Sequence, residues 1–175
     1  MLAIAAATCA SCSDPELRGT AMFDRIFQSS TPRGIARLAP KSGSTARGLI
    51  QFYPGDGYVG VAGNIFDLAP GAHSVYIHAN GNCSSPNGAS AGPVWNIEGA
   101  ANPGRARTGD LPEINVRETG DAELALRLRG VSVGTGRPDD VIGHAVVVHD
   151  GVVRDPMPVF GADTGFIACG VIEGR

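Results

Sequence analysis

The sequence predicts an all-β domain, a closed antiparallel Greek-key barrel or sandwich of about eight short strands with two long loops. The chain has 25 Gly and 12 Pro but only 6% aromatic residues, a composition typical of short strands joined by tight turns. Alternating or continuous apolar segments of strand length recur along it. A length of 175 residues allows one domain with a proper hydrophobic core, and is too short for two ordinary domains.

Seven segments carry the strand pattern. In one of them, Leu124, Leu126 and Leu128 share a face while Arg127 and Arg129 point away, as alternation in a strand requires. The expected strands cover residues 35–38, 47–53, 58–66, 73–79, 123–129, 142–149 and 166–172. The two long loops are residues 80–120 and 150–165, which are rich in Gly and Pro. Loops of such length are functional or disordered.

The N-terminal segment predicts export. Residues 1–12 are small and apolar and are interpreted as the remnant of an export or lipoprotein signal, with a start codon inside a longer signal peptide. Cys12, or else Cys9, is the candidate for lipid attachment; a Cys-x-x-Cys redox or metal pair is the weaker interpretation. Residues 13–35 form a lead-in segment, and the domain covers 36–175. A lipidated Cys would attach the protein to a membrane.

Net charge and cysteine content bear on the binding partners and on disulfide formation. The formal net charge of −3 gives no broad basic field, so we expect no nucleic-acid partner. An exported chain would oxidise Cys83 and Cys169, and closing so long a loop would contribute roughly 4 to 5 kcal/mol in the chain-entropy model. The alternative is two buried free thiols.

Histidines on the predicted strands suggest a metal site that is incomplete. Tyr76 and His78 are two residues apart on a strand and share a face, and His149 ends a second strand. Histidines gathered from neighbouring strands are how a β-protein assembles a metal centre. Tyr76 stands where a further histidine would be expected.

Five ordered segments resemble the copper/zinc superoxide dismutase family, over residues 36–172. They are residues 68–78, Cys83 with 90–96, 106–111, 143–149 and 166–172. The resemblance implies the family's Greek-key barrel and pairs Cys83 with Cys169 as its disulfide.

The ligands that the resemblance implies are largely replaced. The four copper positions fall on Tyr76, His78, Val94 and His149. The zinc positions fall on Val94, Glu98, Arg107 and Asp110, of which only Asp110, a zinc-position remnant, is retained. The family arginine that guides superoxide to copper falls on Phe166.

These replacements bear on activity because dismutation needs a metal that cycles between two oxidation states. Two imidazoles would hold copper weakly, Val94 has no lone pair, and Arg107 would repel a zinc ion. A phenol ordinarily ionises only near pH ~10, so a metal would have to be bound already to deprotonate Tyr76. We therefore expect either no cofactor or weakly bound copper, held by His78, His149 and Tyr76, and no zinc.

Each of these residues also has a structural interpretation. Tyr76 and His78 could be hydrogen-bonded rings on the barrel wall, and Asp110 could anchor the long loop through backbone N–H groups. His73 is expected to tie a loop to the copper-ligand strand, and His144 to lie on the surface. Two large rings are expected to fill space left by the metals: Trp95 and Phe166.

The sequence therefore predicts an exported superoxide dismutase-like protein, periplasmic or extracellular, whose activity is impaired or lost and which serves a binding or structural purpose. One alternative is an enzyme of low efficiency with a copper-only site. Another is a copper carrier that uses His78, His149 and Cys9 with Cys12. The binding partner is not identifiable from the sequence, and a homodimer is an open alternative.

Overall fold

The computed structural model describes residues 31–97, 106–153 and 165–175. Within these ranges the chain forms nine strands and one 3-10 turn, and no α-helix. The strands are β1 (Gly34–Pro40), β2 (Arg47–Gly55), β3 (Tyr58–Phe66), β4 (Gly71–His73), β5 (Val75–His78), β6 (Ile114–Val116), β7 (Ala122–Leu128), β8 (Ala145–His149) and β9 (Phe166–Gly174). The turn covers Ala89–Ala91. The all-β prediction is confirmed.

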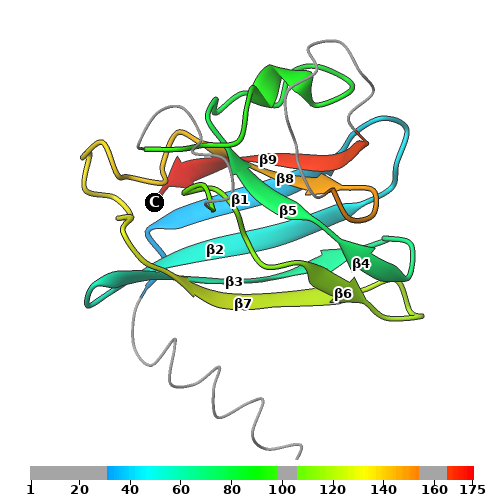
Figure 1. Cartoon of the computed structure of the whole chain (residues 1–175), viewed down its shortest axis with the longest axis horizontal. Helices are drawn as coiled ribbons and strands as arrows, with labels where there is room; N and C mark the ends of the chain where they lie inside the picture. The colour runs from blue at the N-terminus through cyan, green and yellow to red at the C-terminus, as the bar shows by residue number, and fades with distance from the viewer. Residues whose placement is uncertain (1–30, 98–105, 154–164) are drawn as a thin grey trace, which may run out of the picture.

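The strands make one curled antiparallel sheet and a small second pair. The larger sheet has the order β5-β8-β9-β1-β2-β3-β7, and β4 pairs with β6. Figure 1 shows β4, β5 and β6 lying across β1, β2 and β3, so that the chain wraps around an enclosed interior. β6 runs beside β7 at the far edge of the larger sheet, which nearly closes the barrel.

Alternation of side chains builds the core of this barrel. In β2, Ile50 and Phe52 are fully buried, and Val61 of β3 lies opposite Phe52 in the pairing. Their counterparts across the barrel are Ile77 of β5 and Val146 of β8, which belong to the same cluster and are also fully buried. Every second residue of these strands thus points into one apolar interior.

Both faces of β5 and β8 are buried, unlike those of the other strands. All four residues of β5 and all five of β8 are buried. Their inward side chains join the main core, while Ala145 and Val147 belong to a second cluster with Phe166 and Cys169. The outward side chains of β5 and β8 therefore lie in a layer sealed from solvent.

Two corrections concern the strands. The predicted strand 73–79 is two strands in different sheets, because at Ser74 the chain leaves β4 and its backbone bonds instead to Gly151 and His149. The loop predicted over 80–120 contains β6, which pairs with β4. Three residues are too short for periodicity to reveal a strand.

The disulfide prediction is confirmed. Cys83, in the loop after β5, is bonded to Cys169 of β9 with 5.8 Å between the Cα atoms and a sequence separation of 86. The Lys41 ammonium donates to the Cys83 carbonyl at 2.5 Å, which ties the same loop to the end of β1. The disulfide and this bond together fix the outer loop over β8 and β9.

The N-terminal predictions lie outside the described residues. These are the signal remnant 1–12, with Cys9 and Cys12, and most of the lead-in 13–35. In the described part of that lead-in, β1 already begins at Gly34. No helix among the described residues has the length and apolar character needed to cross a membrane.

Candidate functional site

Four aromatic rings occupy the sealed layer on the outer face of β5 and β8. The imidazoles of His78 and His149 are nearly parallel, with ring centroids 6.0 Å apart and planes at 27°. Tyr76 meets His149 edge-on at 5.1 Å. The Phe166 ring stands edge-on to both histidines, 5.1 Å from His78 and 4.6 Å from His149. The structure thus brings the three candidate copper residues together, with an apolar ring packed against both imidazoles.

His78 is held as a neutral imidazole. The side chain is 2% exposed, and Nδ1 lies 2.6 Å from the Gly92 carbonyl oxygen. Nε2 is buried and has no hydrogen-bond partner among the described residues. Burial lowers the pKa of His78 from 6.5 to about 4, against the opposing effect of the bond to Gly92, and the Arg107 charge lowers it further.

The Tyr76 hydroxyl is engaged elsewhere. It donates to the Val153 carbonyl at 2.5 Å, and the Val153 N–H donates in turn to Ser74 Oγ at 3.0 Å. These bonds connect β5 to the chain that follows β8. The phenol that was a candidate ligand thereby serves as a tie between two segments.

The residues present do not fit a complete copper site. Val94, to which the resemblance assigns a ligand position, lies beside His78 through a backbone bridge and carries an aliphatic side chain. No cluster of three or more His, Cys, Asp and Glu side chains suited to a metal occurs in the described ranges. Two imidazoles remain, and weak copper binding by His78 and His149 is the most that this donor set supports.

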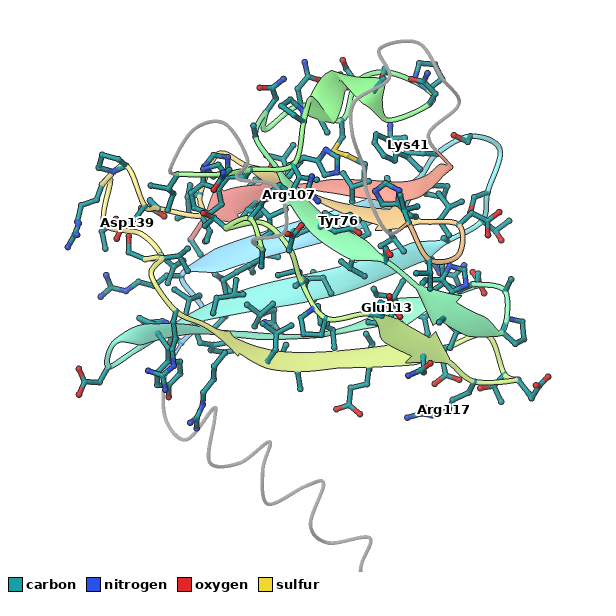
Figure 2. All side chains as sticks on the ribbon, viewed as in Figure 1. Lys41, Tyr76, Arg107, Glu113, Arg117 and Asp139 are labelled. Carbon is teal, nitrogen blue, oxygen red and sulfur yellow. A yellow bond between two sulfur atoms is a disulfide. The ribbon has the colours of Figure 1, made fainter. Side chains whose placement is uncertain are left out.

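An ion pair occupies the position expected for zinc. Asp110, placed beside Tyr76 by a backbone bridge, accepts from Arg107 Nε at 3.0 Å and Nη2 at 2.7 Å through one oxygen. Its other oxygen accepts from the Arg107 backbone N–H at 2.6 Å. The guanidinium also lies over the Tyr76 ring, 5.6 Å from its centroid (Figure 2). Both carboxylate oxygens are thus bonded to one arginine, and zinc does not fit.

The glycine between these two residues lets the loop approach β5. A Cβ atom built on Gly109 would lie 2.1 Å from the Ile77 carbonyl oxygen, closer than any side chain allows. Without one, the Ile77 N–H donates to Gly109 O and the Gly109 N–H donates to Trp95 O, each at 2.8 Å. The loop that carries Arg107 and Asp110 is therefore fastened to the ring layer by backbone bonds.

His73 links two loops to the histidine strand. It is 2% exposed, with Nδ1 2.8 Å from the His149 carbonyl oxygen and Nε2 2.8 Å from that of Ala69. The Gly151 N–H also approaches Nδ1, at 3.1 Å. These contacts fix the backbone at His149 and hence the place of its ring.

The structure corrects the expected position of His144 and shows that Trp95 and Phe166 pack in different places. The surface position expected for His144 is wrong, because this residue is half-buried, stacks on Trp95 at 4.1 Å and contacts the Ala79 carbonyl through Nδ1 at 2.8 Å. Trp95 covers one face of the His144 ring, and the alternation of residues along a strand does not predict such a contact. Trp95 thus packs on His144, whereas Phe166 packs on the histidine pair. Glu98, the remaining zinc-position residue, lies outside the described ranges.

The contact of Tyr76 with Val153 has no signal in the sequence. A backbone carbonyl can accept this bond from any residue type, so no motif marks it. Only the folded chain brings residue 153 to β5.

Comparisons with known proteins agree with this architecture. The profile of the copper/zinc superoxide dismutase (SODC) family matches residues 46–172. The superoxide dismutase [Cu-Zn] of Caulobacter vibrioides is 32% identical over 115 residues, which are 61% of this chain and 66% of that protein, just under two thirds of its length. The crystal structure of the clock protein EA4 superposes with a TM-score of 0.66 and 31% identity, covering 84% of this chain and 98% of that one. The chain belongs to the copper/zinc superoxide dismutase family.

Proposed function

We propose that this chain is an exported member of the family that does not catalyse dismutation and acts instead as a binding or structural protein. The observation that carries the proposal is the ring layer. Of the four copper positions, two hold imidazoles, Val94 has no donor atom, and the Tyr76 hydroxyl is bonded to a carbonyl. Phe166 fills the space against both imidazoles.

Two further features support the proposal. Arg107 takes up both oxygens of Asp110, so no zinc is needed to neutralise that carboxylate or to hold its loop. Phe166 also stands where the resemblance places a guiding arginine, so that position contributes no positive charge to draw an anionic substrate inward. A redox centre, a structural metal and a substrate guide are thus replaced together.

Export is the second part of the proposal. A disulfide between Cys83 and Cys169 suits an oxidising compartment, because thiols are kept reduced in the cytosol. We place the protein in the periplasm or outside the cell, with Cys12 as the residue that would carry a lipid. A mass increase on residue 12 in the mature protein tests the anchor, and an intact unmodified N-terminal peptide contradicts it.

Superoxide decay after copper loading tests the catalytic part. The full chain is loaded with copper and its second-order rate is compared with that of the metal-free protein. We expect no metal-dependent rate above background. Restoring the imidazoles with Tyr76→His and Val94→His provides the matched positive control, and measurable turnover by the unaltered chain would overturn the proposal.

Copper carriage is a second candidate, favoured by one observation. His78 Nε2 is buried without a hydrogen-bond partner among the described residues, and the His149 ring lies 6.0 Å away by centroid. A neutral imidazole with an available nitrogen is a copper ligand. Stoichiometric copper(I) binding without turnover, lost in His78→Ala with His149→Ala, would establish a carrier, and absence of binding would exclude it.

A further inference from the structure

We propose that a pocket between the end of β7 and the loop that carries Arg107 binds a small oxyanion of two or more negative charges, of the diphosphate type. This pocket, here called the arginine pocket, is lined by Arg107, Arg127 and Arg129 together with Thr108 and Asn96. The inference rests on the proposed function, because it names a ligand for a protein that acts by binding. The pocket lies outside the ring layer and involves none of its histidines.

Size and lining suit a small polar ligand. The pocket has a volume of about 540 Å³, within the range of small-molecule sites. The described residues of its walls come from parts of the chain that are far apart in sequence, 96–97 and 106–110 on one side and 127–130 on the other. Residues that the fold already brings together need less ordering when a ligand binds, which lowers the cost of binding.

Charge sets the class of ligand. Three arginines line the pocket, and Asp110, the single acidic residue among the described residues of its lining, is already paired with Arg107. Arg127 and Arg129 form no ion pair within the described ranges. The pocket therefore carries a local excess of positive charge on a chain whose formal net charge is −3. Such a local excess attracts an anion, although the molecule as a whole is negatively charged.

The arginines are also oriented. Arg127 lies over the Tyr58 ring, 4.7 Å from its centroid, and Arg107 is held by Asp110. Stacking uses the face of a guanidinium and leaves N–H groups on its edge to donate. Arg129, one residue past the end of β7, lines the same pocket as Arg127. Planar forks so placed match the oxygens of phosphoryl groups, which they bind in bidentate fashion.

Calorimetric titration of the full chain with pyrophosphate at low salt tests the proposal. We expect saturable one-to-one binding that weakens by about tenfold in Arg127→Gln and again in Arg129→Gln, each a lost charge-assisted contact. Arg37→Gln is the matched control, since it removes an equal charge from β1, outside the pocket, and we expect less than a twofold change. Arg107 is left unaltered because it holds Asp110.

Salt and vesicles distinguish a specific anion site from general attraction between charges. Binding should weaken in 0.5 M NaCl, because salt screens exposed charges. No saturable binding by the unaltered chain, or an equal loss in Arg37→Gln, would overturn the proposal. Binding to vesicles containing phosphatidylglycerol but not to pyrophosphate would also overturn it, in favour of a membrane surface. Superoxide decay is measured on the same samples, so a failure of the arginine pocket leaves the proposed lack of dismutation standing.

Discussion

The two regions to which the family resemblance assigns copper and zinc, here called the copper and zinc positions, are built in opposite ways. At the copper positions, apolar and hydrogen-bonded groups stand where donors would be, and the two remaining imidazoles are buried with Phe166 against them. At the zinc positions, an organic cation, the Arg107 guanidinium, stands beside Asp110, which thereby keeps a positive partner. Aromatic and aliphatic side chains fill the copper positions, whereas an arginine supplies a positive charge at the zinc positions.

The difference follows from the donor that remains in each region. A carboxylate that is largely shielded from water is costly without a partner, so Asp110, whose side chain is 24% exposed, is stabilised by a positive group. A neutral imidazole has no charge that needs a partner, so a histidine can stay in an apolar layer in its uncharged form. The two regions should therefore respond differently to mutation and to pH.

The largest expected effect is in the zinc region. Asp110→Ala should lower the free energy of unfolding by about 3 kcal/mol, because it leaves Arg107, whose side chain is 16% exposed, without its partner and removes an acceptor for a backbone N–H. Chemical denaturation measures the change. Asp121→Ala is the matched control, since the Arg117–Asp121 pair lies on the surface with 63% of the arginine side chain exposed. Equal losses in the two variants would show that the Arg107–Asp110 pair has no special role.

The next largest effect is the pH dependence of stability that His78 gives to the copper region. The folded pKa of His78 is lowered to about 4 from 6.5, so between these values the unfolded chain binds more protons and stability is lost as the pH falls. We expect His78 to account for a loss of about 2 kcal/mol between pH 7 and pH 5. Denaturation at both pH values, with His78→Gln as the comparison, isolates this contribution. A slope that is the same in both proteins would mean that His78 titrates normally.

The smallest effect concerns the bond by which Tyr76 of β5 holds the chain that follows β8. Tyr76→Phe keeps the ring under Arg107 but removes the bond to the Val153 carbonyl, and should cost about 1 kcal/mol. Tyr58→Phe makes the same change under Arg127 and serves as the control. Faster amide exchange at Val153 in the Tyr76 variant alone would locate the loss. Unchanged exchange there would contradict the proposed tie.

Much of the fold is predictable because alternation and turn residues are local signals. The predicted strand 58–66 coincides with β3, and the predicted strand 123–129 differs from β7 by one residue at each end. The division at Ser74 is not predictable, since it depends on backbone bonds to Gly151 and His149, more than seventy residues away. β6 escapes prediction for a similar reason, because three residues become a strand only when β4 pairs with them.

The sequence by itself determined which donors exist. No fold can make a metal ligand of the Val94 side chain, and within a strand the spacing of two residues puts Tyr76 and His78 on one face. What those side chains do was decided by the tertiary structure. The Tyr76 hydroxyl meets Val153, Arg107 closes on Asp110, and Phe166 reaches both imidazoles only because distant segments pack over β5 and β8. Residue chemistry is local, whereas burial and partnership are properties of the packed chain.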